Sequence, residues 1–160
     1  MQLKQIGIIR TPYKSVKEML IQPAGAGRAV GSIELNPELA EGLKDIAGFS
    51  HLLVIYGFHR VAGSRLTVTP FLDQVPHGVF ATRAPTRPNP LGLSLLQLVR
   101  IAGTTLQVAG VDMLDGTPLF DIKPYVPEFD QPLGEVRCGW LERNAGHAVT
   151  VRSDGRFGDR

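Results

Sequence analysis

Short apolar runs separated by glycine, proline and aspartate recur along the whole chain. Their length and their content of isoleucine, valine and leucine predict strands rather than long helices. The expected strands cover Gln5–Arg10, Val30–Leu35, His51–His59, Leu66–Thr69, Gly78–Thr82, Leu93–Ile101, Thr105–Met113 and Leu119–Lys123. The run "HLLVIYGFH" is apolar without alternation in its middle, which predicts a strand buried on both faces.

One stretch, residues 36–48, changes to a helical period. Asn36 followed by Pro37 is typical of a helix cap with proline at the first helical position, and Gly48 marks an end. The apolar residues between them fall at helical spacing, at Leu39, Leu43 and Ile46. Many strands, one such helix and 18 glycines predict a mainly β protein, a small β-barrel with one or two short helices.

Length and composition limit the number of domains, the partners and the cellular compartment that can be expected. A chain of 160 residues suits one domain over residues 1–160, with residues 127–160 expected to form an excursion and a tail. The net charge of +2 argues against a broadly basic surface for sequence-blind DNA binding. A single cysteine, Cys138, excludes an internal disulfide, and no apolar run reaches the length of a membrane span or signal-peptide core. We therefore expect a cytoplasmic protein with no membrane and no DNA partner.

The loop "FATRAPTRPNPLGLS", residues 80–94, combines three prolines with two arginines. Each proline fixes its own φ and restricts the residue before it, so the loop is stiff and loses little entropy when a ligand binds. Arg83 and Arg87 are permanently charged planar donors suited to a carboxylate or a phosphate. The alternative is structural: the prolines end strands and the arginines cover a rim. The loop alone leaves both interpretations open.

A second polar cluster lies in "DMLDGTPLFDIKPY", residues 112–125. Asp115 and Gly116 form a turn signal between two apolar runs, which places the carboxylate at a strand end where it can face a pocket. A plain hairpin turn with an aspartate tolerant of the backbone fits the segment equally well. Asp121 and Lys123 share one face of the next strand, as pairs on a solvated surface commonly do.

Other signals predict little chemistry. "GAGRAVG", residues 25–31, has the wrong glycine spacing for a dinucleotide fingerprint and is interpreted as a loop. The four histidines show no metal-ligand spacing, so no metal site is predicted. Cys138 lacks a local nucleophile motif, which argues against a covalent mechanism.

The two long motifs, with the opening "IGIIRTPY", closely resemble the TsaA/TrmO family over about residues 5–129. This resemblance implies a small β-barrel methyltransferase outside the Rossmann class, which uses S-adenosylmethionine and works as a homodimer with the cofactor site near the subunit interface. It also implies a tRNA substrate, because the characterised bacterial members resemble enzymes that methylate the exocyclic amine of threonylcarbamoyladenosine beside the anticodon.

The resemblance also carries cofactor contacts onto this chain. They fall in "LIQP", "GFH", "FATR", "LGLS" and "DGTP", at Gln22, His59, Arg60, Arg83, Leu93, Asp115, Gly116, Thr117 and Pro118. Arg83 suits a carboxylate or a ring edge, Asp115 a diol or an ammonium group, and Leu93 an adenine face. Arg87 and Asn89 are expected to hold the loop or meet the substrate.

Methyl transfer from a sulfonium needs alignment of donor and acceptor more than a strong base. Where the accepting amine needs help to lose its proton, Asp121 is the carboxylate predicted to take it. The acceptor stays open at this stage, since bacterial tRNA enzymes of the family carry a further C-terminal domain beyond the position matching Arg160. A small-molecule methyltransferase and a barrel that senses S-adenosylmethionine or docks RNA without turnover are the two alternatives.

Overall fold

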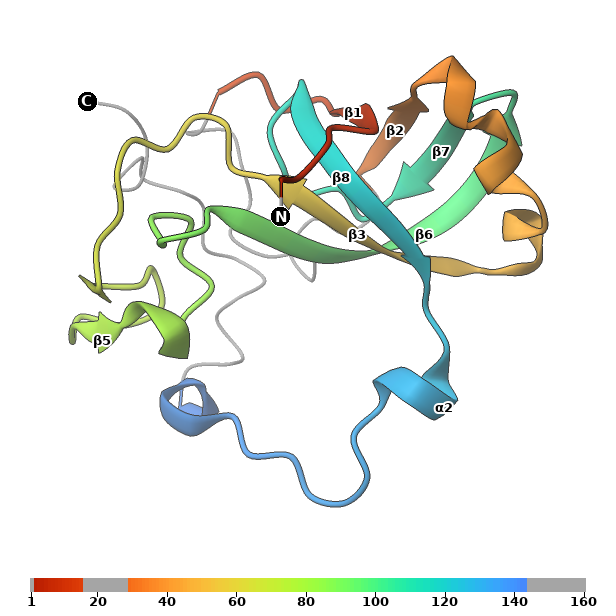
Figure 1. Cartoon of the computed structure of the whole chain (residues 1–160). Helices are drawn as coiled ribbons and strands as arrows, with labels where there is room; N and C mark the ends of the chain where they lie inside the picture. Colours follow the sequence, from red (N-terminus) through yellow and green to blue (C-terminus); the bar gives the residue numbers. More distant parts are fainter. Residues whose placement is uncertain (1, 16–28, 144–160) are drawn as a thin grey trace.

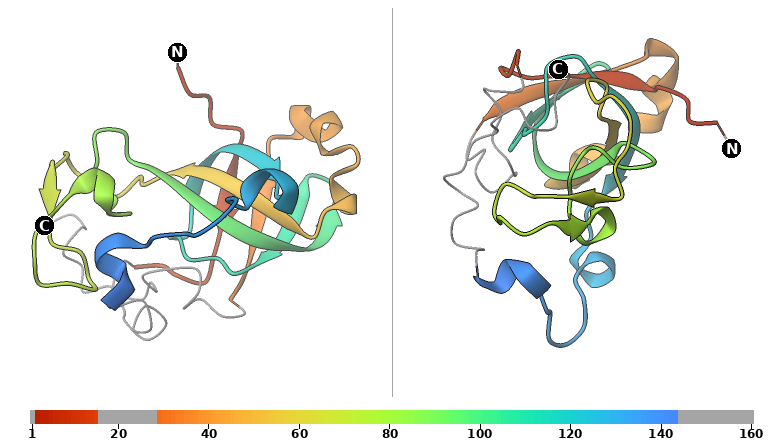
Figure 2. Two further views of the ribbon diagram at one scale, coloured as in Figure 1. Left: turned by 90° about the horizontal axis from the view of Figure 1, so that it is seen from below. Right: turned by 90° about the vertical axis from the view of Figure 1, so that its left-hand side faces the viewer.

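Six antiparallel strands close into a barrel in the computed structural model, which describes residues 2–15 and 29–143 (Figure 1). The order around the ring is β1-β2-β7-β6-β3-β8, and the pairing of β8 with both β3 and β1 completes it. The barrel strands are β1 (Gly7–Arg10), β2 (Val30–Leu35), β3 (His51–Gly57), β6 (Leu91–Ala102), β7 (Thr105–Ala109) and β8 (Thr117–Pro124). The predicted small β-barrel is confirmed, and the right-hand view in Figure 2 looks along it.

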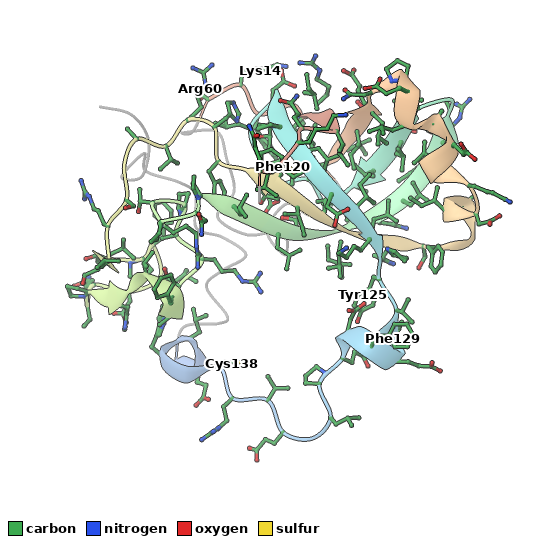
Figure 3. The ribbon with its side chains drawn as sticks, in the orientation of Figure 1. Lys14, Arg60, Phe120, Tyr125, Phe129 and Cys138 are labelled. Atoms are coloured by element: carbon green, nitrogen blue, oxygen red, sulfur yellow. The ribbon has the colours of Figure 1, made fainter. Side chains whose placement is uncertain are left out.

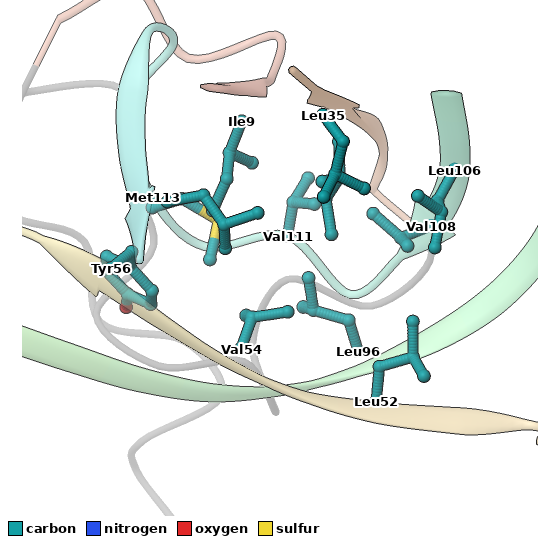
Figure 4. Close-up of a cluster of buried hydrophobic side chains, with 12 residues drawn as sticks. Ile9, Leu35, Leu52, Val54, Tyr56, Leu96, Leu106, Val108, Val111 and Met113 are labelled. Carbon is teal, nitrogen blue, oxygen red and sulfur yellow. The ribbon is translucent and has the colours of Figure 1, made fainter. Parts of the chain in front are cut away.

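Alternate residues of each barrel strand point inward and fill its centre (Figure 4). The fully buried strand residues include Ile9, Ile33, Leu52, Val54, Leu96, Leu106, Val108 and Leu119. Along β3 only one face is buried, because Leu53 and Ile55 on the outer face keep part of their surface exposed. The prediction of a strand buried on both faces was therefore wrong. A barrel strand with partly exposed apolar residues on its outer face reads as a continuous apolar run, just as a central sheet strand does.

The segment between β7 and β8 crosses one end of the barrel. The two strands lie three places apart in the ring of six, so they do not pair, and the chain must pass over the opening. Gly110, with a φ of 87°, ends β7, and Val111 and Met113 then point down into the core, where they are 0% and 2% exposed. The prediction of one strand over Thr105–Met113 was wrong beyond Ala109. The buried alternation of a crossing segment looks like a strand in the sequence.

The predicted helix of residues 36–48 is two shorter 3₁₀ segments, η2 (Pro37–Leu43) and η3 (Ile46–Gly48). Asp45 adopts a φ of 66° and interrupts them, since left-handed backbone cannot continue a helix. The apolar spacing did identify the side chains that face the core, because Leu39, Leu43 and Ile46 pack against it. Asn36 does not cap the segment with its side chain, which instead donates to the carbonyl of Gln5 at 3.3 Å.

Residues 66–86 form a small layer beside the barrel, with the short strands β4 (Thr67–Val68) and β5 (His77–Gly78) and a satellite core. The expected strand over Gly78–Thr82 was wrong, because Val79–Ala81 is a 3₁₀ turn, η4. Thr82 closes this turn: its hydroxyl and its amide both donate to the carbonyl of Val79. Such local bonding replaces a strand ladder.

After β8 the chain forms a single helical turn, α2 (Pro127–Asp130), and an exposed stretch that leads to the 3₁₀ segment η5 (Gly139–Arg143). Trp140 fixes η5 to the small layer. Its indole N–H donates to the carbonyl of Ala81 at 2.9 Å, and its ring stacks on His77 with centroids 4.5 Å apart. The predicted excursion therefore returns to the molecule at a defined place.

A cross-strand contact between β3 and β6 generates a stability prediction. Gly92 lies directly opposite Tyr56, and a Cβ on Gly92 would overlap the buried tyrosine ring. We expect Gly92→Ala to lower the free energy of unfolding by about 1–3 kcal/mol, because the ring cannot move without disturbing the core. Urea denaturation measures the loss. Gly42→Ala is the control, since nothing lies within 4 Å of a Cβ there, and an equal loss in both variants would contradict the packing argument.

Candidate functional site

Most of the residues singled out in the sequence lie at one end of the barrel. This end holds the chain that follows β1 and β3, the chain that precedes β6, and the segment from β7 to β8. Figure 3 shows Lys14 and Arg60 there, at the opposite side of the view from Tyr125 and Phe129. The predicted residues at this end are His59, Arg60, Arg87, Asn89, Asp115, Gly116, Thr117 and Pro118. Gln22 lies outside the described residues.

The proline-rich loop is braced from within by one of its two arginines. The guanidinium of Arg87 donates to the carbonyl of Thr82 at 3.2 Å and to that of Ala84 at 3.5 Å. Arg83, in contrast, is exposed, and its positive charge partly opposes the rise that burial causes in the pKa values of Asp112 and Tyr56. Arg87 thus holds the loop, and Arg83 supplies a cation to the surface of the barrel end.

Asp115 anchors its turn to the chain that follows β1. Its carboxylate accepts the amide N–H of Thr11 at 3.0 Å and pairs with Lys14 at 2.7 Å. The Lys14 contact, followed by the Thr11 bond, holds the pKa of Asp115 below its ordinary value. Gly116 has a φ of 77°, a left-handed conformation that favours glycine and explains the Asp-Gly signal. The turn is therefore a fixed structure with an ionised carboxylate.

Leu93 lies on the outside of the barrel and is 55% exposed. Gly92 and Ser94 on either side of it are buried, so Leu93 faces outward close to the start of β6, at the rim of this barrel end. Leu95, two residues along on the same face, is 39% exposed, and Phe80 in the adjoining loop is 76% exposed. Exposed apolar side chains and an exposed arginine are the two kinds of group that a ligand with both flat apolar and charged parts requires.

A buried polar network, absent from the sequence predictions, joins this end of the barrel to its interior. The hydroxyl of Ser94 donates to the Oδ1 atom of Asp112 at 2.9 Å, and the Tyr56 hydroxyl lies 3.1 Å from the same serine oxygen. Because the single serine hydrogen is used on Asp112, Tyr56 donates to Ser94. Ser94 went unnoticed because leucines flank it on both sides, and Asp112 because the crossing segment looked like a strand.

Burial sets the protonation of this network. It raises the pKa of Asp112 to about 6, against the lowering effects of the Ser94 hydrogen bond, the aspartate's own backbone N–H and the charge of Arg83. Burial, followed by the negative charge of Asp112, raises the pKa of Tyr56 well above its ordinary range. The end of the barrel that the β7–β8 segment crosses is called the mouth from here on. There, partial burial and then the charge of Arg60 lower the pKa of His59. Near neutral pH the network is thus a protonated tyrosine beside a carboxylate close to its titration point.

Asp121, the predicted proton acceptor, lies outside this group. Its carboxylate pairs with Lys123 at 2.8 Å and accepts the amide N–H of Ile122 at 3.0 Å. It sits opposite Ile55 on the outer face, whereas Tyr56 points inward. In the described part of the chain, no three His, Cys, Asp or Glu side chains gather as metal ligands, and no helix is long and apolar enough to cross a membrane.

The closed antiparallel barrel defines a small β protein, and its end at the β7–β8 crossing holds the candidate ligand-binding residues. Residues 8–131 match the family described as the tRNA-methyltransferase O N-terminal domain, and the chain belongs to this family. The predicted TsaA/TrmO assignment is confirmed.

Three similar proteins illustrate the family. A probable S-adenosyl-L-methionine-binding protein of Pyrococcus abyssi is 52% identical, over 96% of this chain and 83% of its own length. The tRNA (adenine(37)-N6)-methyltransferase of Escherichia coli is 38% identical, over 88% of this chain. The crystal structure of TrmO from Pseudomonas aeruginosa superimposes with a TM-score of 0.72 at 34% identity, over 88% of this chain. These names agree with the predicted cofactor and reaction class.

The relatives differ in how much of their length this chain matches. It spans 64% of the Escherichia coli enzyme and 62% of the Pseudomonas aeruginosa structure, both less than two thirds. The barrel and its mouth are thus the shared part. Activities that need the remaining length of those proteins are not carried over by this match.

The buried carboxylate predicts a pH dependence of stability. The folded pKa of Asp112, about 6, lies above the unfolded value, so its contribution to stability is complete below about pH 4 and is lost as the pH rises through 6. Relative to Asp112→Asn, which cannot ionise, the wild type should lose about 2–3 kcal/mol between pH 4 and pH 7. Urea denaturation of both proteins across this range tests it. A constant difference between them would show that Asp112 is not desolvated.

Proposed function

We propose that the protein is an S-adenosylmethionine-dependent methyltransferase that methylates the exocyclic amine of threonylcarbamoyladenosine beside the tRNA anticodon, in the cytoplasm. The observation that supports the proposal is topological: the loop of Arg83 leads into the start of β6, where Leu93 lies, and the Asp115–Pro118 turn leads into the start of β8, at the same end of the barrel. The name of the Escherichia coli relative, a tRNA (adenine(37)-N6)-methyltransferase, supports the amine and its position. The threonylcarbamoyl group is the part that rests on the motif resemblance alone.

The residues at the mouth fit S-adenosylmethionine chemically. That ligand presents a carboxylate, an ammonium group, a ribose diol, an adenine and a sulfonium, which call for a cation, a carboxylate, backbone groups and an apolar wall together. Arg83 supplies the cation and the exposed Leu93 the wall. Gly116, Thr117 and Pro118 lie on a braced turn, since the Gly116 N–H donates to the carbonyl of Ile9 at 3.0 Å and the Thr117 hydroxyl to that of Leu114 at 2.7 Å. The ligand contacts proposed for Gly116 and Pro118 are therefore made without a backbone N–H. His59 and Arg60 border the mouth, with Gln22 as a further candidate.

In this mechanism the chain has to bind S-adenosylmethionine, align it with the accepting amine and exclude water. S-adenosylmethionine, when bound, supplies a methyl group on a positively charged sulfur, so the accepting amine must give up a proton in the course of the reaction. The proline-rich loop, braced by Arg87, holds Arg83 in place with little entropy left to lose. Asn89 is exposed beside it and can meet the substrate.

Methyl transfer itself is the first test of this function. Purified protein, S-adenosylmethionine and tRNA carrying threonylcarbamoyladenosine should yield S-adenosylhomocysteine and a nucleoside heavier by one methyl group, measured by mass spectrometry. The control is the same tRNA without the threonylcarbamoyl group. Tight cofactor binding without turnover on any RNA would instead support the sensing barrel, and turnover without RNA the small-molecule enzyme.

Arg83 generates a binding prediction. Removing a charge-assisted contact to the ligand carboxylate should weaken S-adenosylhomocysteine binding by about 1.5–3 kcal/mol in Arg83→Ala, with the fold intact because this side chain is exposed. Isothermal calorimetry gives the affinity and circular dichroism the fold. Arg100→Ala, an exposed arginine on β6 away from the mouth, is the matched control. Equal affinity in both variants would place the site elsewhere.

A homodimer is part of the same proposal, because Leu93 faces outward. In register, Leu53 lies opposite Leu95 and Ile55 opposite Leu93, so the outer walls of β3 and β6 form one apolar surface. A ligand against Leu93 lies on this surface and needs a second cover to exclude water. A second copy of the chain is the occupant we propose, in line with the motif resemblance, and closed two-fold dimers are the commonest oligomers.

Light scattering at micromolar concentration tests this assembly. The wild type should have twice the mass of one chain, with a contact of about 1,600 Å² or more beside the loop of residues 83–93. Leu95→Asp should shift the mass toward one chain because it buries a charge in the contact, whereas Gln107→Asp on the exposed face of β7 should not. A single-chain mass for the wild type, with and without cofactor, would refute the shared site.

A further inference from the structure

The segment that crosses the barrel mouth carries two of the three carboxylates in the motif of residues 112–125, and the three differ in their partners. Asp115 is ion-paired with Lys14 and also accepts a backbone N–H. Asp121 is ion-paired with Lys123 on the outer wall. Among the described residues, the only side chain that hydrogen-bonds Asp112 is the neutral Ser94, through Oδ1. Within residues 2–15 and 29–143, Asp112 is thus the one of the three carboxylates with no ion pair to a cation.

We propose that Asp112 takes the proton from the amine that accepts the methyl group, and that Ser94 and Tyr56 position it. This inference rests on the proposed function and adds a catalytic residue to it. Asp112 lies on the crossing segment between Val111 and Met113, both buried, so its backbone is held over the mouth. Arg83, the proposed cofactor contact, is near enough for its charge to act on this carboxylate.

The hydrogen-bond order makes Ser94 and Tyr56 positioning residues. Tyr56 donates to Ser94, and Ser94 donates to Oδ1, which leaves Oδ2 of Asp112 as the atom to receive a proton. Tyr56 keeps its own proton, because burial raises its pKa far above neutrality. The tyrosine ring is itself fixed, lying over Gly92 and edge-on to Phe58 at 5.5 Å between centroids. The network therefore orients the carboxylate and does not carry the proton away.

The step balances as follows. The nitrogen of the accepting amine forms its bond to the methyl carbon and loses one hydrogen, which Asp112 binds at Oδ2. The methyl carbon leaves the sulfur, which keeps the electron pair of the broken bond and becomes a neutral thioether. A carboxylate that titrates near pH 6 is mostly ionised at pH 7 and still basic enough to accept that proton. The titratable or charged groups that act on it among the described residues are Tyr56 and Arg83.

The test compares Asp112→Asn with wild type in three measurements. We expect S-adenosylhomocysteine affinity within about threefold of wild type by calorimetry, a single-turnover methyl-transfer rate at pH 7 lower by about 100-fold or more, and loss of the fall in rate below about pH 6. Carbon-13 NMR of the ligand-free wild type should show one carboxyl titrating near pH 6 that is missing in the variant. Asp45→Asn, at the opposite end of the barrel, is the matched control.

Ser94→Ala separates positioning from mere folding. Because the serine hydrogen bond lowers the pKa of Asp112, its removal should move the midpoint of the pH–rate profile upward, while the calorimetric affinity stays unchanged. This readout also covers the case in which Asp112→Asn fails to fold.

Three results would overturn the inference. A rate in Asp112→Asn within threefold of wild type would do so, and more so if Asp121→Asn loses the rate instead. A loss of S-adenosylhomocysteine affinity of tenfold or more in Asp112→Asn would assign the carboxylate to ligand binding. A wild type that methylates no RNA overturns the proposed function together with this residue's role, and that outcome is distinct from the first two.

Discussion

The segment between β7 and β8 has to span the mouth of the barrel, because these two strands lie on opposite sides of the ring. Val111 and Met113 seal the core from above, and their burial fixes the backbone between and after them. Asp112 is thereby held next to Ser94, and Asp115 next to the chain that follows β1. One crossing connection thus closes the fold and also positions two of the carboxylates on which the proposed chemistry depends.

The mouth is bordered by two rigid elements of opposite charge, a loop with an arginine and a turn with a carboxylate. On one side, prolines and the Arg87 brace fix the loop that carries Arg83. On the other, the Asp115 turn is fixed by Lys14 and Thr11. Between them the barrel interior contributes a desolvated carboxylate, and the outer wall contributes exposed leucine. A preformed arrangement of this kind suits a transfer that requires alignment of two reactants more than a strong base.

The residue types along the chain made the turn at Asp115 and the stiff loop predictable. Asp115 with Gly116 predicted a turn because glycine readily adopts the left-handed conformation that a tight turn needs, and the stiffness of the loop followed from its prolines. The sequence did not reveal which distant residues contact the turn, such as Thr11 and Lys14 on Asp115. Apolar alternation described the crossing residues and a strand equally well, and leucines on both sides of Ser94 hid its inward direction. The helix predicted over residues 36–48 is interrupted at Asp45, whose left-handed backbone is tolerated by aspartate but is not specified by the apolar spacing on which the prediction relied.

Binding of S-adenosylmethionine and its product at this mouth can be tested by amide NMR on addition of S-adenosylhomocysteine, because each backbone N–H reports its own surroundings. We expect the affected amides to cluster in residues 57–60, 83–94 and 110–118, with residues 37–48 at the opposite end unchanged. Shifts confined to residues 37–48 and the β6–β7 turn, or no shifts at millimolar ligand with a folded protein, would contradict it.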